Sequence, residues 1–159
     1  SGMGKTLTEE YTVSQAKSDF LGVYAGQAAL PMAGEALNYI WSERWGRVTV
    51  LDRESNRSIG IYDWNALSGR DPYEFFLSGS LSLITLENPN AKTDDRLILF
   101  RDSFGSSIAP YFLEGYREIT LVDIRYLSPE RLGKLLDFTD CDVLFLYSTL
   151  VLNNSETIK

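Results

Sequence analysis

Alternating strand and helix patterns in residues 95–159 constrain the fold of this chain more than any other feature. Five elements are predicted there in order: a strand at 96–100, a helix at 106–114, a strand at 118–122, a helix beginning at 128–130 and a strand at 142–147. Parallel strands joined by crossover helices have this order. The run after Asp142 is apolar at every position, which predicts a strand covered on both faces. The sequence therefore predicts an α/β fold with a parallel sheet.

Boundary signals accompany both predicted helices. Gly115 is placed to end the first helix. Ser128 and Pro129 fit the N-cap and the first position of the second helix. The predicted buried stripe of the second helix consists of Leu132, Leu135 and Leu136.

The preceding residues 4–94 are β-rich. Short strands are predicted at 37–41, 47–51, 58–62 and 81–86. Turn-forming residues around Asn56 join the second and third of these strands into an antiparallel hairpin. A short helix is predicted at 71–77, with Asp71 as its N-cap and Pro72 at its first position. At 159 residues, the chain fits a single α/β domain.

Charge and residue usage exclude several classes of function. The chain has 15 basic and 22 acidic residues, and its net charge of −7 disfavours binding to nucleic acid. No stretch approaches the roughly 20 apolar residues of a membrane span. The lone Cys141 precludes an internal disulfide, and it is predicted to be a small core residue. Histidine is absent, so the commonest general base and nitrogen ligand for metals is missing.

The turn after the strand at 96–100 is the candidate site. Ligands of open α/β sheets bind at the carboxyl ends of strands, beside helix N-termini. The backbone N–H groups of Ser103, Phe104 and Gly105 are therefore candidate donors to an oxyanion or a bound anion, and Ser103 is the candidate nucleophile. The alternative is that Asp102 or Ser103 only caps the helix.

A serine nucleophile needs a basic partner. A helix N-terminus contributes roughly 0.3–1 kcal/mol, less than the about 1.4 kcal/mol of one pKa unit. Ser–His–Asp chemistry is excluded within this chain because histidine is absent, and a Ser–Lys pair would need a buried lysine. None of the lysines has the sequence setting of a buried residue: Lys5, Lys17, Lys92, Lys134 and Lys159.

Further polar side chains are predicted near the same edge of the sheet. Asp102 and Asp123 follow neighbouring strands and would form a cation site or a phosphoacceptor pair, although no third oxygen ligand accompanies them. The alternative for Asp123 is a structural ion pair with Arg101 or Arg125. Asn153 is either an accessory hydrogen-bond donor or part of a chain-end loop. We predict no metal and no cofactor.

Aromatic residues are frequent in the β-rich portion, where Trp41, Trp45, Tyr62 and Trp64 lie close together in the sequence. Exposed rings of this kind stack on sugars. The alternative is that they pack the hairpin onto the helices.

Several segments resemble the DHHW family of bacterial proteins, relatives of the SGNH-hydrolase-like acyltransferases that O-acetylate alginate and other cell-surface polysaccharides. The matching segments are residues 11–13, 19–22, 71–77, 97–107, 118–126 and 142–147. The resemblance covers most of the chain, and the order of the segments is more specific than any one motif. It implies an SGNH-like (flavodoxin-like) three-layer core in the C-terminal half and Ser103 as the nucleophile.

The sequence departs from this family at one point. The family's activating Asp and His belong to an Asp-His-His-Trp motif that precedes the nucleophile, and this chain lacks it. We expect residues 1–3 to be a tag remnant and residues 4–159 to be the C-terminal part of a longer parent. The resemblance implies that the parent is extracytoplasmic and hydrolyses or transfers acyl esters on cell-envelope polysaccharide, and that this part alone is inactive. The alternatives are a noncatalytic module that binds carbohydrate or an anion and, third, a cytoplasmic phosphoacceptor domain.

Overall fold

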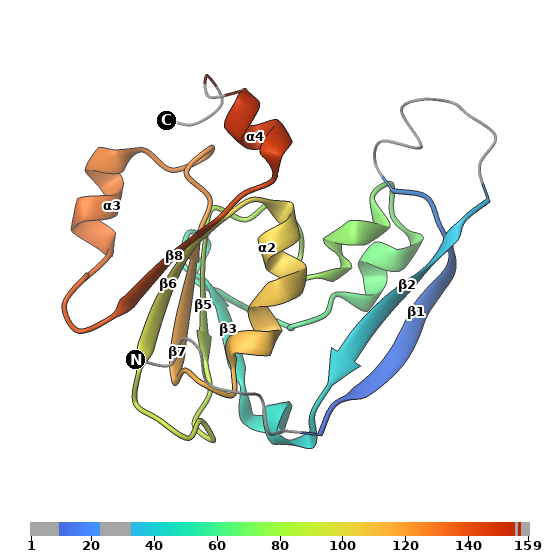
Figure 1. The fold of residues 1–159 in the computed structure, drawn as a ribbon, viewed down its shortest axis with the longest axis horizontal. Helices are drawn as coiled ribbons and strands as arrows, with labels where there is room; N and C mark the ends of the chain where they lie inside the picture. Colours follow the sequence, from blue (N-terminus) through green and yellow to red (C-terminus); the bar gives the residue numbers. More distant parts are fainter. Residues whose placement is uncertain (1–9, 23–32, 155, 157–159) are drawn as a thin grey trace.

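The computed structural model describes residues 10–22, 33–154 and 156, which form a six-stranded sheet flanked by helices and a separate two-stranded sheet (Figure 1). The strands are β1 (Thr12–Phe20), β2 (Glu35–Trp41), β3 (Thr49–Asp52), β4 (Arg57–Ile59), β5 (Leu83–Glu87), β6 (Arg96–Arg101), β7 (Glu118–Val122) and β8 (Asp142–Leu146). The α-helices are α2 (Ser103–Ile108), α3 (Pro129–Leu135) and α4 (Thr149–Asn153). The 3-10 helices are η1 (Glu43–Arg47), η2 (Trp64–Ser68), η3 (Pro72–Phe75) and η4 (Ala109–Phe112).

The large sheet is mixed, with the strand order β4-β3-β5-β7-β6-β8. Strand β6 pairs in parallel with both β7 and β8, as the sequence predicts. Strand β5 pairs antiparallel with β7, so the antiparallel strands of the first half extend the same sheet. The prediction of parallel strands in the C-terminal half is therefore confirmed for β6, β7 and β8, and the sequence did not predict that the antiparallel strands belong to the same sheet. Antiparallel pairing across β5 needs no crossover helix, and only the short 3-10 helices η2 and η3 lie between β4 and β5.

Side chains of β6 alternate between two cores on opposite faces of the sheet. Leu97 and Leu99 pack on the face that holds Leu113, just after η4, whereas Ile98 and Phe100 pack on the face that α3 covers through Leu132. Figure 1 shows α2 and α3 on opposite sides of the sheet. The result is three layers around β6, with Cys141 half-buried against the α3 side.

Two predicted helices differ from those observed. The helix predicted at 106–114 begins earlier, at Ser103, and becomes 3-10 at Ala109, because Asp102 caps its start and Pro110 cannot donate the backbone hydrogen bond that would continue an α-helix. It also ends at Phe112, before Gly115. The helix predicted at 71–77 is the short η3, and its predicted cap is confirmed: the side chain of Asp71 accepts the N–H of Tyr73.

Strand β8 is an edge strand, and the prediction that it is covered on both faces is wrong. Leu144 and Leu146 pack on the core, but Val143 and Phe145 on the opposite face are 37% and 64% exposed. The ring of Phe145 stacks at 4.5 Å on Phe100 and leaves its other face open. The described residues place α3 over β6 and not over β8. For the same reason Leu135, predicted to be buried, is exposed.

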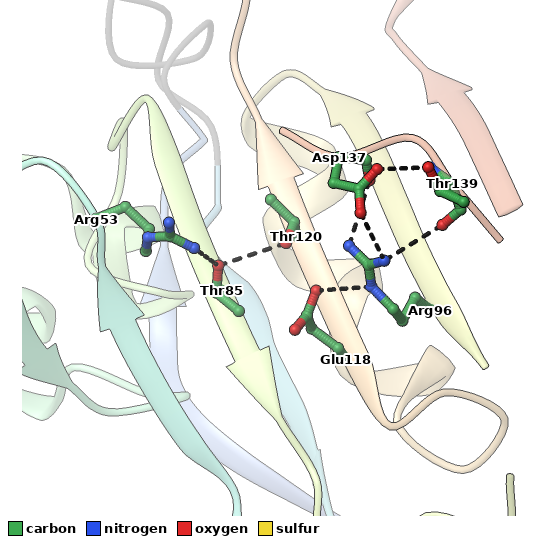
Figure 2. Close-up of polar contacts among 7 residues, drawn as sticks. All are labelled: Arg53, Thr85, Arg96, Glu118, Thr120, Asp137 and Thr139. Carbon is green, nitrogen blue, oxygen red and sulfur yellow. Dashed lines mark hydrogen bonds and ion pairs between the residues drawn. The ribbon is translucent and has the colours of Figure 1, made fainter. Parts of the chain in front are cut away.

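Polar contacts tie the strands of the sheet together (Figure 2). The hydroxyl oxygens of Thr85 on β5 and Thr120 on β7 lie 3.4 Å apart in the buried sheet, and Arg53 donates to Thr85. Arg96, at the start of β6, contacts Glu118 of β7 and donates to backbone carbonyls at 137 and 139 in the loop before β8. These contacts fix the amino ends of the parallel strands. No helix in the described part of the chain has the length and apolar character to cross a bilayer.

The predicted hairpin around Asn56 is confirmed as β3–β4. Asn56 has φ 53°, a left-handed conformation that asparagine adopts more readily than most residues. At its start, the buried carboxylate of Asp52 accepts the N–H of Glu54 at 3.0 Å and the hydroxyl of Ser55. Burial acts to raise the pKa of Asp52, but these hydrogen bonds outweigh it and hold the pKa below its ordinary value.

We expect Asp52→Asn to lower the free energy of unfolding at pH 7 by about 1–2 kcal/mol, because a neutral amide accepts these hydrogen bonds less strongly than a carboxylate. A depressed pKa stabilises the fold above the carboxyl's unfolded pKa of about 3.9, and this contribution is lost as the pH falls through the folded value. The difference between the two proteins should therefore shrink in urea unfolding at pH 2.5. An equal difference at both pH values would contradict this account.

Candidate active site

The carboxyl end of β6 lies where the direction of the chain reverses across the sheet. The chain passes from β6 to β7 on one side and then back across to β8 on the other, so the ends of β6 and β8 are adjacent. Such a reversal is where open α/β sheets bind ligands. Asp102 joins the two ends: Oδ1 accepts the N–H of Phe104 at 3.0 Å, and Oδ2 accepts the N–H of Ser148, after β8, at 2.7 Å. The capping interpretation of Asp102 is thus confirmed.

Ser103 is the first residue of α2 and is half-buried beside a small hollow of about 20 Å³, enough for roughly one water molecule. The other residues that line the hollow come from 71–80 and from α2: Asp71, Tyr73, Glu74, Phe76, Gly79, Ser80 and Ser106. The hydroxyl of Ser106 is buried without a hydrogen-bond partner in the described structure. Ser103 therefore faces a polar hollow at the predicted end of the sheet.

Two of the predicted anion donors already serve the turn itself. The N–H of Phe104 donates to the Asp102 carboxylate, and the N–H of Gly105 donates to the Asp102 carbonyl at 3.1 Å. A Cβ on Gly105 would lie 2.4 Å from Cβ of Arg101, so packing against Arg101 requires the glycine here. An anion at Ser103, Phe104 and Gly105 stays a prediction, and it would have to compete with these hydrogen bonds.

A buried ion pair lies beneath the turn. Arg101 and Asp123 are both fully buried, with Nη1 and Oδ2 3.6 Å apart. Asp123 also accepts from Arg125 at 2.9 Å (Nε) and 2.6 Å (Nη2). Burial lowers the pKa of Arg101, and the Asp123 carboxylate opposes that shift. Asp123 therefore makes the structural ion pairs of the alternative interpretation, and the described residues contain no cluster of acids, cysteines or histidines able to hold a metal.

A strained segment borders the hollow. Leu77, Ser78 and Gly79 have φ values of 54°, 55° and 83°, and a left-handed conformation costs a residue with a Cβ roughly 1–2 kcal/mol. Burial of the Leu77 side chain and a 3.0 Å hydrogen bond from its N–H to the carbonyl of Ile61 hold the segment. Backbone strain of this kind is concentrated at functional sites.

No lysine or arginine is among the residues that line the hollow at Ser103 in the described part of the chain. The hydroxyl of Ser103 has no side-chain hydrogen-bond partner there, and Lys17, Lys92 and Lys134 are not among the residues that line its hollow. Lys92 is exposed and pairs with Glu114, as expected of a surface lysine. Lys5 and Lys159 lie outside the described residues. Asn153 ends α4, where a loop was the alternative prediction, and it does not line the hollow.

The clustered tryptophans differ in exposure, and so in whether they fit packing in the core or stacking on a sugar. Trp45 is buried and contacts the rings of Tyr11 and Trp41, so it belongs to the core. Trp64 is 55% exposed and packs edge-on against Tyr39.

Sequence reasoning missed the contribution of residues 73–80 to the site. Tyr73, Glu74 and Ser80 reach Ser103 only through the tertiary fold. The available signal was the run Ser78-Gly79-Ser80 after a capped helix, which marks a tight turn without saying what it faces.

The order of strands, the layers and the turn at Ser103 define an α/β protein with a three-layer core, extended by antiparallel strands and a hairpin. Solved structures that share this fold include a DHHW family protein from Eubacterium siraeum, with 22% identity and a TM-score of 0.68 over 94% of this chain and 52% of that chain. They also include Bacillus cereus PatB1, determined with a sulfonyl adduct (21% identity, TM-score 0.64, 89% of this chain and 48% of that one) and without it (20% identity, TM-score 0.61).

At these identities the likeness establishes a shared fold. The chain spans about half the length of the structures it matches. No protein-family model matches the sequence, and no curated protein does so.

Proposed function

We propose that this chain is the nucleophile-bearing part of a DHHW-type, SGNH-like protein, and that Ser103 takes the acyl group from esters on cell-envelope polysaccharide outside the cytoplasm. The observation that carries the proposal is the position of Ser103: the first residue of α2, at adjoining strand ends, beside a polar hollow. In such chemistry the hydroxyl oxygen attacks the ester carbonyl, a base accepts the hydroxyl proton, and the sugar alcohol leaves.

The shared fold supports a nucleophilic role. One PatB1 structure carries a sulfonyl adduct. A sulfonyl group is an electrophile, and it is retained where a nucleophile attacks it. We propose the same reactivity for this chain and assign it to Ser103.

The base and its partner carboxylate come, in this proposal, from polypeptide outside these 159 residues. The matched structures are about twice as long as the part that this chain matches. One edge of β8 pairs with no other strand among the described residues, and Phe145 of β8 is exposed; this is the surface on which further strand and helix would pack. Just after β8, the N–H of Ser148 donates to the Asp102 carboxylate, so polypeptide packed along this edge would reach the Ser103 turn.

Chemical rescue tests the proposal without the missing polypeptide. The chain is incubated with phenylmethylsulfonyl fluoride, with and without imidazole as a free base, and the adduct is located by peptide mass spectrometry. We expect slow labelling alone and labelling of Ser103 that is faster by about 10²-fold with imidazole, the low end for general-base catalysis.

Ser106→Ala is the matched control, because Ser106 lines the same hollow and is the more deeply buried serine. Ser103→Ala should abolish the imidazole-dependent adduct, and Ser106→Ala should retain it. Labelling spread over several serines, or none at Ser103 with imidazole, would contradict the proposal.

A noncatalytic module is the second candidate function. It is favoured by the engagement of the Phe104 and Gly105 N–H groups within the turn. It predicts ligand binding that Ser103→Ala leaves unchanged, with no rescue of sulfonylation by imidazole.

A further inference from the structure

A second, larger hollow of about 320 Å³ adjoins the one at Ser103, with Tyr73 and Phe76 lining both. Its walls come from β2, which pairs with β1 in the two-stranded sheet, and from the α2–η4 segment. From β2 it is lined by Leu37, Asn38, Tyr39 and Ile40, and from α2 and η4 by Ser107, Ile108 and Tyr111; Tyr62 completes the wall. We call this hollow the tyrosine groove. Its volume is at the lower end of the roughly 300–1,000 Å³ of ligand pockets.

Aromatic rings form the walls of the tyrosine groove and are held in place by internal contacts. The hydroxyl of Tyr62 donates to the carbonyl of Ile40 at 2.6 Å, and the hydroxyl of Tyr73 donates to Ser107 at 2.9 Å. Burial raises the pKa of Tyr73, so this phenol stays protonated at neutral pH. Tyr39 packs edge-on against Tyr62 at 5.0 Å. Rings fixed in this way present flat faces without a large loss of side-chain entropy on binding.

The lining of the tyrosine groove carries no charged side chain: its residues are tyrosine, phenylalanine, leucine, isoleucine, serine and asparagine. The chain as a whole has a net charge of −7, so an anionic polymer would be repelled without any local cation to compensate. A purely apolar chain would cover the exposed amide of Asn38 without giving it a hydrogen-bond partner. A ligand with apolar ring faces and many neutral hydroxyl groups satisfies both conditions.

We propose that the tyrosine groove binds an uncharged pyranose oligosaccharide, whose ring stacks on Tyr111 and whose hydroxyl groups bond to the amide of Asn38. The Ser107 hydroxyl already donates to the carbonyl of Phe104 and accepts from Tyr73, so it offers a sugar hydroxyl only its second lone pair. Tyr111 is 40% exposed, which leaves its ring accessible to a sugar. That the bound sugar also carries the ester attacked by Ser103 rests on the proposed function, whereas sugar binding in the groove does not. Because its lining carries no cation, the groove disfavours polyuronates such as alginate.

The test is isothermal titration of the Ser103→Ala protein with N-acetylchitopentaose, cellopentaose and a mannuronate pentamer. We expect binding of at least one neutral pentasaccharide and no binding of the mannuronate. Trp64 packs edge-on at 5.4 Å against Tyr39, which lines the groove, so a parallel titration followed by tryptophan fluorescence should also show sugar binding. Tyr111→Ala should weaken the neutral sugar by about tenfold, a typical effect of losing one aromatic contact.

Tyr126→Ala is the matched control, since Tyr126 is 52% exposed and does not line the groove. Added to the Ser103→Ala protein, it should leave the affinity for the neutral sugar unchanged. Asn38→Ala, at an exposed position on β2, gives a second test if Tyr111→Ala fails to fold. Absence of binding by both neutral sugars, equal binding of the mannuronate, or unchanged affinity in the groove variants overturns the inference. Sugar binding without imidazole-dependent labelling of Ser103 would remove the proposed function and leave the groove intact.

Discussion

Replacing Asp123 by alanine should lower the free energy of unfolding by about 3–5 kcal/mol, the usual cost of removing one partner from a buried ion pair. Asp123 is fully buried and contacts both Arg101 and Arg125. Arg125 is 21% exposed and can turn toward water once its partner is gone. Arg101 is fully buried and cannot, so its positive charge would remain desolvated. Urea unfolding at pH 7 measures the loss.

Removing Arg101, the other partner of this ion pair, should lower the free energy of unfolding by less. Arg101→Met keeps most of the buried stem and leaves Asp123 paired with Arg125, so we expect less than half of the Asp123→Ala effect. The double variant Arg101→Met/Asp123→Leu should recover most of the stability, because neither buried charge remains. A double variant as unstable as Asp123→Ala would show that packing, and not the unpaired charge, determines the loss.

Local signals predicted the elements of the parallel half because each is decided within a few residues. The strands at 96–100, 118–122 and 142–147 were recovered within one residue as β6, β7 and β8, since continuous apolar runs bounded by turn residues have few other structures. Helix boundaries were predicted less well. The start at Ser103 depends on the Asp102 side chain capping the helix, and several nearby polar residues offer the same signal.

Which side chains of these strands are exposed could not be predicted from the apolar runs. The run 143–147 indicates a strand suited to burial on both faces, but burial depends on what lies beside it, and α3 covers β6 instead. The mixed sheet was missed for a related reason, because nothing within β5 encodes that its partners are β3 and β7. Partner choice is a property of the whole chain.

The turn that carries Ser103 was predictable from the sequence, and the residues that face it across the hollow were not. Ser103 and the cap at Asp102 follow from one turn, and the Asp123 ion pairs were among the stated alternatives because charged partners stand two residues away and in the next strand. Tyr73 and Ser80 were not predicted, because more than 20 residues separate them from Ser103 and only tertiary packing brings them together. The tyrosine groove was missed for the same reason, since β2, η4 and Tyr62 each contribute part of its wall.

Gly105→Ala should destabilise the fold by about 3 kcal/mol or more, although alanine is intrinsically the better helix former by about 1 kcal/mol. The new Cβ would lie 2.4 Å from Cβ of Arg101 and 3.1 Å from its Cγ. Cβ is the fixed root of that side chain, so relief requires β6 and α2 to move apart. This movement would also displace Ser103, and the imidazole-dependent labelling should fall together with the urea midpoint.

Gly133→Ala is the matched control, because Gly133 lies in α3 and a Cβ there meets nothing within 4 Å. Its exposed position offers no clash, so the substitution should stabilise the protein by about 0.5–1 kcal/mol through helix propensity alone. The same chemical change thus has opposite signs at two helical glycines. If both variants are stabilised, then β6 and α2 are not packed as closely as the structure places them, and the position of Ser103 relative to the strand ends must be revised.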